Sequence, residues 1–269
     1  MIKYPNKIPL FDKAGLVYHY TSHTTVLEHI FYNGQIEFGR MHNTNDPYER
    51  KVWSIDINRV EWTSTDDDID KEIKAYHMLN TIHSKCHLFC TTLDSYRNSD
   101  EYLGRGFSIP SLWAHYSANH KGVCLIFNQS KLTEAVLNTA EKINIPYFCE
   151  KMEYGNPPDI DHPAFNNLIT MNEDSIDNIV VKHIIHHYKT LFFTKDKTWD
   201  HENEFRFVVI VRDNEPFKID ISGALEGIVL GEYFPESYLP LIENAKNKYQ
   251  CDSFRIEWQN GLPQVYPYP

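Results

Sequence analysis

The chain has 269 residues, of which 42% are hydrophobic and 14% aromatic, so it can form a core and global disorder is disfavoured. Its formal net charge of −11 argues against nucleic-acid binding through overall electrostatics, although it leaves room for a local basic groove. Five dispersed cysteines, no apolar export segment and no membrane-length apolar run predict a cytoplasmic protein with reduced thiols and no membrane partner.

Hydrophobic periodicity and turn signals predict short strands and helices that alternate without the regular strand–helix repeat of a parallel sheet. In the first half of the chain we expect a strand at 16–20, a helix at 25–33 opened by a capping box at Thr25 and Glu28, strands at 36–38 and 86–92, helical turns at 112–116 and a strand at 122–127. In the second half we expect a helix at 132–142, an extended pair at 143–154, a helix at 174–193, and a strand from about 202. Strands at 219–221 and 227–231 and a helix at 236–248 complete the prediction. Loops are expected at 43–49, 94–110 and 155–165. These elements predict a single mixed α+β domain over 1–269, with helical insertions at 50–80 and 155–190.

A charged row lies on the otherwise apolar strand that is predicted to begin near Glu202. Side chains alternate between the two faces of a strand, so Glu202, Glu204 and Arg206 would share one face. Two carboxylates and a guanidinium are costly to bury without a partner or ligand, which makes the row a site candidate. The same spacing also fits a solvated edge strand with a structural Glu–Arg pair.

Polar and aromatic residues also cluster ahead of the predicted strand at 122–127. His115, Tyr116 and His120 form a compact group there that suits the rim of a cleft. Trp113 and Trp199 fit either core anchors or residues that stack on a ligand.

The turn-rich loop around Asp46 offers a third group of candidates. Asp46 precedes Pro47, a favourable turn arrangement in which the Asp side chain bonds nearby backbone. Asn45 and Glu49 lie close by in the sequence, so the loop could instead line a cleft or bind a cation.

Several blocks occur in an order that is typical of one family. The blocks are Tyr18-His19-Tyr20-Thr21-Ser22, Asn45-Asp46-Pro47-Tyr48-Glu49, Trp113-Ala114-His115-Tyr116 leading to His120-Lys121-Gly122-Val123-Cys124, and Lys195 through Trp199 to Glu202-Asn203-Glu204-Phe205-Arg206. Together they resemble the bacterial domain of unknown function 2971 (DUF2971) family, over a core of about 16–245. The resemblance implies a bacterial or phage-related cytoplasmic protein, with a defence or toxin context suspected.

The opening Tyr-His-Tyr-Thr-Ser block, followed by a helix, a glycine and a strand, is also similar to the start of ADP-ribosyltransferase folds. That resemblance implies a split sheet and NAD as the cofactor. It further implies that His19 bonds NAD, that Tyr116 packs on the nicotinamide, and that Glu204 is the catalytic carboxylate of a Glu-x-Glu element.

The same resemblance assigns supporting roles to neighbouring residues. Glu202 would orient an acceptor or water, and Arg206 would bind pyrophosphate or hold Glu204. The further cofactor-binding candidates are Tyr20, Ser22, His115 and Lys195. A fixed carboxylate near the ribose would stabilise the oxocarbenium-like state in which the nicotinamide–ribose bond breaks. The expected ligand is a nucleotide-type small molecule, and the acceptor stays open.

Two other functions remain open from the residues alone. Asp46, Glu49, Glu202 and Glu204, with Lys195, could form a divalent-metal site of a nuclease or phosphodiesterase. No cysteine or histidine pair has zinc-finger spacing, so we expect no zinc site. Alternatively, the polar groups could belong to a non-enzymatic module that senses a nucleotide.

Overall fold

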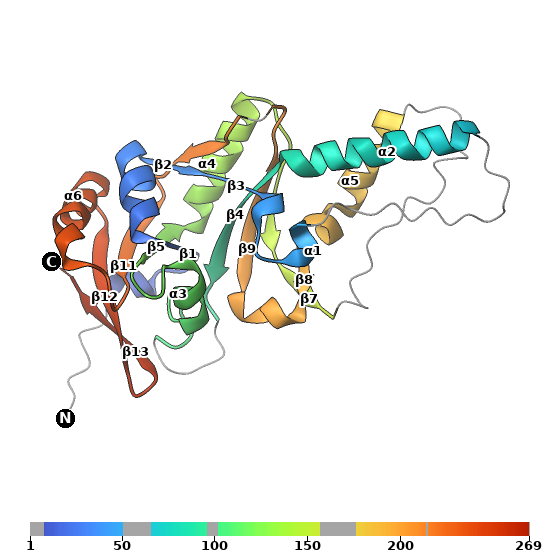
Figure 1. Ribbon diagram of the computed structural model, residues 1–269. Coiled ribbons are helices and arrows are strands. Elements are labelled where there is room, and N and C mark those ends of the chain that lie inside the picture. The colour runs from blue at the N-terminus through green and yellow to red at the C-terminus, as the bar shows by residue number, and fades with distance from the viewer. Residues whose placement is uncertain (1–7, 51–65, 96–101, 157–175, 214, 269) are drawn as a thin grey trace.

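The computed structural model describes residues 8–50, 66–95, 102–156, 176–213 and 215–268 (Figure 1). The helical elements are η1 (Pro9–Asp12), η2 (Thr25–Phe31), η3 (Met41–Asn43), α1 (Pro47–Arg50), α2 (Asp66–Lys85), α3 (Pro110–Tyr116), α4 (Gln129–Lys142), α5 (Ile176–Phe192), η5 (Lys197–Glu202), η6 (Glu236–Tyr238) and α6 (Leu239–Tyr249). The strands are β1 (Leu16–Thr21), β2 (Gln35–Glu37), β3 (Gly39–Arg40), β4 (Cys86–Leu93), β5 (Val123–Asn128), β6 (Tyr147–Lys151), β7 (Glu153–Gly155), β8 (Thr194–Asp196), β9 (Glu204–Ile210), β10 (Lys218–Asp220), β11 (Leu225–Leu230), β12 (Asp252–Gln259) and β13 (Leu262–Pro267). The predicted α+β class is confirmed. Within these ranges, no helix has the length and apolarity that a membrane crossing requires.

A nine-stranded sheet forms the centre of the molecule, in the order β13-β12-β11-β5-β1-β4-β9-β6, with β3 added on β4. Its neighbouring strands are antiparallel except β11 and β12, which are parallel and are connected through α6. Two smaller sheets pair β10 with β2 and β7 with β8. The long antiparallel path explains why no regular strand–helix repeat is visible in the sequence.

The sheet opens between β1 and β4. These strands pair only at Val17 with Leu93 and at Tyr18 with Thr92. By contrast, β1 pairs with β5 from its first residue to its last, and β4 pairs with β9 over nearly its whole length. We call this divergence the β1–β4 opening, and His19 is the first residue inside it. The two halves of the sheet are thus joined only over a short distance.

Helices cover both faces of the sheet. On one face η2, α4 and α6 pack on alternate strand residues, as Val26, Val136 and Ile242 show. On the other face η1 and α3 pack on the intervening residues, with Phe11 and Trp113 in the buried cluster. The alternation of Val17, Leu125 and Ile228 with Tyr18, Ile126 and Val229 is the two-residue period of strands that are buried on both faces.

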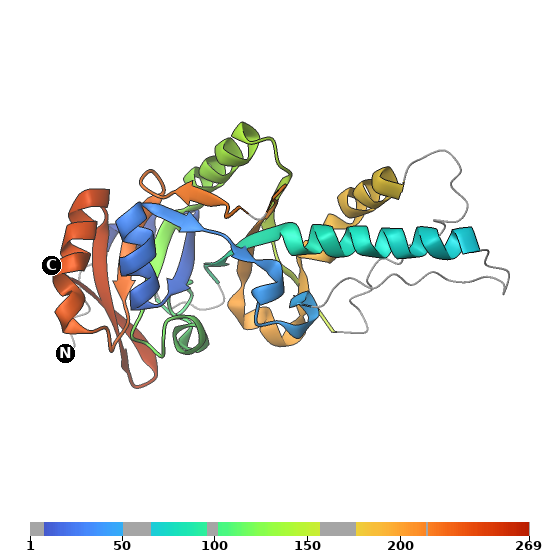
Figure 2. The same ribbon diagram turned by 45° about the horizontal axis from the view of Figure 1, so that its top comes forward.

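Helices α2 and α5, which overlap the ranges of the two predicted insertions, form a helical arm and lie side by side beyond the β6 edge in both views (Figures 1 and 2). Ala75 and Leu79 of α2 pack with Val180 and Ile184 of α5. Residues 51–65 of the first insertion and 157–175, which include most of the predicted loop at 155–165, lie outside the described residues.

The structure differs from the sequence predictions at the start of one strand, at the cap of the first helix and in the C-terminal strands. The predicted strand at Glu202 begins at Glu204, because Asn203 adopts a left-handed conformation (φ 44°) that ends the 3-10 helix η5. Ser22, and not Thr25, caps the first helix, since its Oγ accepts a hydrogen bond from Thr25 N at 3.0 Å. The strands β12 and β13 were not predicted, and buried Phe254 extends the core beyond residue 245.

Candidate functional site

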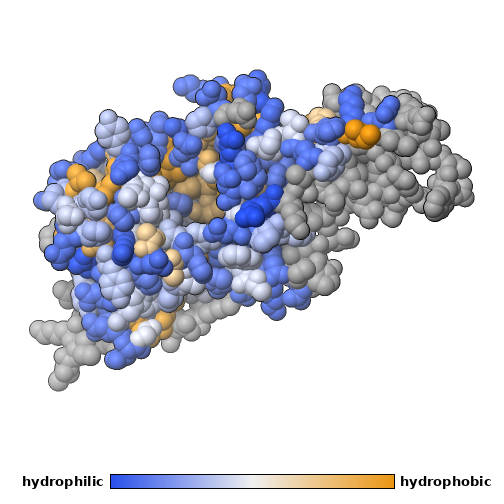
Figure 3. Space-filling model, in the orientation of Figure 1, coloured by the Kyte–Doolittle hydropathy of each residue, from blue (hydrophilic) through white to orange (hydrophobic). Residues whose placement is uncertain are grey.

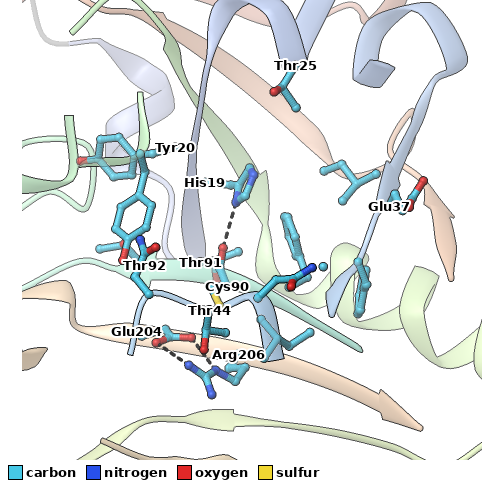
Figure 4. A pocket seen from close by; sticks show the side chains of 18 of the residues that line it. His19, Tyr20, Thr25, Glu37, Thr44, Cys90, Thr91, Thr92, Glu204 and Arg206 are labelled. Atoms are coloured by element: carbon cyan, nitrogen blue, oxygen red, sulfur yellow. Dashed lines mark hydrogen bonds and ion pairs between the residues drawn. The ribbon is translucent and has the colours of Figure 1, made fainter. Parts of the chain in front are cut away.

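A cavity of about 740 Å³ lies at the β1–β4 opening. Residues of both strands line it, together with η2, the β2–β3 segment, residues 43–49 and the start of β9. Figure 3 shows a hollow in the surface on the side of the molecule that faces the viewer, with apolar surface inside the hollow and hydrophilic side chains around it. In Figure 4, Thr25 lies on one side of His19, and Glu204 and Arg206 lie on the opposite side.

His19 projects into the opening from β1 (Figure 4). Its Nδ1 lies 2.9 Å from the carbonyl oxygen of Cys90 on β4, and because a carbonyl only accepts, Nδ1 carries the proton. Burial lowers the pKa of His19 to about 4, despite the opposing effect of the Cys90 bond, so the ring is neutral at pH 7. Nε2 is therefore a hydrogen-bond acceptor, and the ring packs against Phe89 at a centroid distance of 4.4 Å.

A buried charged group, which we call the floor cluster, lies at the other end of the cavity. Its members are Asp46, Glu49, Lys195, Glu202, Glu204 and Arg206. Each of the six is at least nine-tenths buried. Four carboxylates therefore share this end of the cavity with two cations.

Glu204 is the centre of the floor cluster. Arg206 binds it through two nitrogens, with Nε 2.6 Å from Oε1 and Nη2 3.1 Å from Oε2. Lys195 Nζ donates to the same Oε2 at 2.9 Å. Burial raises the pKa of Glu204, but the charges of Arg206 and Lys195 lower it by more, so the pKa lies well below its ordinary value. Glu204 is thus a carboxylate with both oxygens engaged.

Glu202 connects the floor cluster to α3. Its Oε2 accepts a hydrogen bond from Lys195 Nζ at 2.8 Å, and its Oε1 accepts one from the Tyr116 hydroxyl at 2.7 Å. Burial and the nearby Glu202 charge raise the pKa of Tyr116 well above its ordinary value, which keeps the hydroxyl protonated as a donor. Lys195 also lies over the Trp199 ring, 5.3 Å from its centroid. The predicted triplet therefore converges, although Glu202 reaches it from a helix.

Asp46 and Glu49 complete the cluster from the 43–49 segment. Asp46 Oδ1 accepts a hydrogen bond from Tyr48 N at 2.8 Å, which fixes the turn before α1. Glu49 Oε1 forms an ion pair with Arg206 Nη2 at 2.6 Å. Within the part of the chain that the structure describes, Asp46 Oδ2 and Glu49 Oε2 are buried and accept no hydrogen bond.

The rest of the cavity combines an apolar wall with a charged rim. The wall includes buried Phe38 and Phe89, whose rings lie 5.5 Å apart and close to parallel. On the rim, Arg40 is exposed, and Lys218 Nζ lies 3.2 Å from Glu37 Oε2 in an exposed ion pair.

The structure brings together most, but not all, of the predicted site residues. Those lining the cavity are His19, Tyr20, Asn45, Asp46, Glu49, Tyr116, Lys195, Trp199, Glu202, Glu204 and Arg206. The Tyr20 hydroxyl is engaged elsewhere, because it donates to the carbonyl oxygen of Gly106 at 2.7 Å.

Four predicted residues lie outside the cavity lining. Ser22 caps the first helix, and His115 is exposed on α3. Trp113 is fully buried and donates from Nε1 to Phe107 O at 2.7 Å, so it is a core anchor. His120 stacks on Trp113 at a centroid distance of 6.3 Å. Trp113, His115 and His120 are close to Tyr116 along the chain, but the short helix α3 and the turn after it direct them away from the cavity.

Sequence reasoning missed the residues that the first helix and β2–β3 contribute to the cavity, among them Thr25, His29, Asn33, Phe38 and Arg40. The alternation of buried Ile36 and Phe38 with exposed Glu37 was visible as a strand pattern. It gave no sign that this strand would lie beside a cavity, because β2 pairs with the distant β10.

The floor cluster offers little room for a metal ion. Two cationic side chains already lie between its carboxylates. Over the described ranges, no three His, Cys, Asp or Glu side chains are grouped so that they could hold a metal ion. The arrangement is better suited to binding hydrogen-bond donors and to fixing the positions of Lys195 and Arg206.

Fold and site together define an α+β protein with a ligand-sized cavity at the opening of an antiparallel sheet. A family model described as "Protein of unknown function (DUF2971)" matches residues 112–207, which confirms the predicted resemblance to that family. The matched segment includes Tyr116, Lys195 and the strand with Glu204, whereas the blocks around His19 and Asp46 lie outside it. No curated protein and no solved structure matches the chain.

Proposed function

We propose that the cavity binds a nicotinamide nucleotide and that the protein consumes NAD, as an ADP-ribosyltransferase or an NAD glycohydrolase. The observation that supports this most is the convergence, in one cavity, of a neutral His19 with an acceptor nitrogen and the Glu202–Tyr116 pair. The cavity volume of about 740 Å³ is within the range of small-molecule sites.

The charge distribution is complementary to oxidised NAD. Glu202, on the Tyr116 side of the floor cluster, supplies a carboxylate that favours the positively charged nicotinamide ring. Arg40 and Lys218 on the rim are available to the pyrophosphate, because charged nitrogen donors are the usual partners of phosphate oxygens. His19 Nε2 would accept a hydrogen bond from a ribose hydroxyl or from the carboxamide N–H.

In the proposed reaction the bond between ribose C1′ and the nicotinamide nitrogen breaks, and its electron pair leaves with the ring. The oxocarbenium-like state that results is stabilised by the nearby Glu202 carboxylate. Water or an acceptor nucleophile then forms a bond to C1′ and releases a proton. The Tyr116 ring keeps the leaving nicotinamide oriented and shielded from water.

The surroundings of Glu204 favour a different role from the catalytic one that the transferase resemblance implies. Three donor contacts from Arg206 and Lys195 engage both of its oxygens. Glu202 also accepts hydrogen bonds at both oxygens, from Lys195 and Tyr116, but Arg206 binds Glu204 and not Glu202. We therefore assign Glu204 as a positioning residue, which holds Lys195 against Glu202, and assign Glu202 as the carboxylate that faces the ribose.

The test is release of nicotinamide from NAD by the purified full chain, followed by chromatography. We expect activity in the wild type and a loss of at least about a hundredfold in Glu202→Gln, the usual scale for removing one electrostatic stabiliser. The matched control is Glu226→Gln, whose carboxylate pairs with the exposed Lys13 and Lys131 outside the cavity and should keep full activity. Equal activity in both variants would contradict the assignment of Glu202.

A titration with NAD and a nuclease assay with and without divalent metal, run beside the nicotinamide assay, separate the other two candidate functions. NAD binding without turnover would favour the nucleotide-sensing module. Phosphodiester cleavage that needs magnesium or manganese would favour the nuclease, which has less support because cations occupy the space between the carboxylates. We place the NAD-consuming activity in the bacterial cytoplasm and, following the family resemblance, in a defence or toxin context.

A further inference from the structure

Two carboxylate oxygens of the floor cluster lack the hydrogen-bond donors that buried carboxylates normally have. Asp46 and Glu49 are each 4% exposed and line the cavity. Among the residues that the structure places, Asp46 Oδ2 and Glu49 Oε2 accept no hydrogen bond. A buried, ionised oxygen without a donor is costly, so such atoms point to a ligand group that supplies donors.

The charge around these oxygens restricts the ligand group further. Lys195 and Arg206 are both engaged by Glu204, and Arg206 also pairs with Glu49. Neither cation therefore neutralises Asp46 through a direct contact. A group with both N–H donors and positive charge would satisfy the free oxygens and offset the excess of carboxylates.

We propose that Asp46 and Glu49 form a subsite for an organic cation with N–H donors, a primary ammonium or a guanidinium, at the floor of the cavity. A divalent metal fits less well, because no set of three metal-ligating side chains is arranged around these oxygens in the described ranges. The subsite is separate from the proposed NAD contacts at His19, Glu202 and Tyr116, because it is formed by Asp46 and Glu49 of the 43–49 segment.

Asp46→Asn is a suitable test variant because it removes the charge and keeps the local fold. The amide oxygen of Asn can still accept the hydrogen bond from Tyr48 N that Asp46 Oδ1 accepts at 2.8 Å. The matched control is Asp220→Asn, which lies outside the cavity and makes the same type of turn, with Oδ1 2.7 Å from Ser222 N. Both variants lose one negative charge, so general electrostatic effects are equal.

The measurement is calorimetric titration of the full chain, without NAD, at constant ionic strength. The probes are agmatine, which has ammonium and guanidinium groups, tetramethylammonium, which has charge but no N–H donor, and 1-methylnicotinamide, which has a pyridinium ring. We expect agmatine to bind the wild type and Asp220→Asn, and to bind Asp46→Asn about tenfold more weakly. Tetramethylammonium should bind at least about tenfold more weakly than agmatine to the wild type.

Three results would overturn the proposal. These are equal binding of agmatine and tetramethylammonium, unchanged agmatine binding in Asp46→Asn, and tighter binding of 1-methylnicotinamide than of agmatine. The last result would instead place the nicotinamide ring of NAD at Asp46 and Glu49. If the protein did not turn over NAD, the proposed function would fail, but these titrations would still test the subsite, because no probe depends on that reaction.

Discussion

At the scale of single residues, the floor cluster is a network in which each cation touches more than one carboxylate. Arg206 contacts Glu204 and Glu49, and Lys195 contacts Glu204 and Glu202. Removing one member leaves its partners buried without compensation, which costs far more than breaking an exposed pair. Glu204 is the member shared by both cations.

We predict that Glu204→Gln lowers the free energy of unfolding by about 3–5 kcal/mol, because it leaves two buried cations with one partner fewer. Urea unfolding followed by circular dichroism at neutral pH measures this loss. As a control, Glu37→Gln breaks an exposed ion pair with Lys218 and should cost less than about 1 kcal/mol. A similar small cost for both variants would show that Glu204 is not the structural centre of the cluster.

His19 gives a prediction about pH. Its pKa in the folded protein is about 4, below the ordinary value of 6.5, because burial disfavours the charged ring. The unfolded chain therefore takes up a proton between pH 6.5 and 4 that the folded chain does not, and stability is lost as the pH falls through this window. Below about pH 4 both states are protonated and the loss stops growing.

His19→Asn removes the titrating ring but keeps an amide nitrogen that can replace Nδ1 as donor to Cys90 O. The stability of the wild type relative to this variant should fall steadily across the window, as measured by urea unfolding at a series of pH values. The exposed His115→Asn variant should follow the wild type. A constant difference between wild type and His19→Asn would mean that His19 titrates normally.

At the scale of elements, the cavity exists because β1 and β4 pair over two positions and then diverge. The other side of β1 is fixed along its whole length by β5. A close approach at the end of this pair holds β1 in place: a Cβ atom on Gly122 would lie 2.1 Å from the carbonyl oxygen of Thr21. Any side chain at 122 must therefore push the end of β1 away.

We predict that Gly122→Ala lowers the free energy of unfolding by about 1–3 kcal/mol or more, because the clash is with backbone and cannot be relieved by a rotamer change. Thermal or urea unfolding of the full chain measures it. Gly223→Ala is the control, since no atom lies within 4 Å of its added Cβ, and it should change stability by less than about 0.5 kcal/mol. Equal effects of both substitutions would contradict the close approach.

Sequence patterns predicted individual elements better than their ends and their partners. Apolar runs located β1, β5 and β11, because each of these strands is buried along most of its length. The left-handed Asn203 that ends η5 has no such pattern, and so Glu202 was placed on the strand. The C-terminal hairpin was missed although Asn260 and Gly261, both with positive φ, form a typical hairpin turn.

At the scale of the whole molecule, the arm of α2 and α5 is attached next to the cavity. Arg206 Nη1 donates to the carbonyl oxygen of Phe192, the last residue of α5, at 3.1 Å. His83 lies near the end of α2, and its Nε2 is 3.0 Å from the carbonyl oxygen of Glu49. Both helices of the arm thus end on residues that contact the floor cluster, an arrangement that only the three-dimensional structure reveals.

The candidate site shows the same limits of sequence reasoning. Glu202, Glu204 and Arg206 were predicted because charges on an apolar strand need partners, and Lys195 was predicted from the transferase resemblance. Their meeting with His19 and Asp46 depends on the order of strands across the sheet, which local patterns do not determine. Lys218 and Arg40 reach the rim for the same kind of topological reason, since β10 pairs with β2 and β3 pairs with β4.

The central claim is that the cavity is an NAD site organised by His19, and calorimetric titration of NAD into three forms of the full chain tests it most directly. We predict binding by the wild type, equal binding by the control His115→Asn, and binding at least about tenfold weaker by His19→Asn, which loses the acceptor Nε2. No binding of NAD by the wild type, or equal affinity in all three forms, would contradict the account.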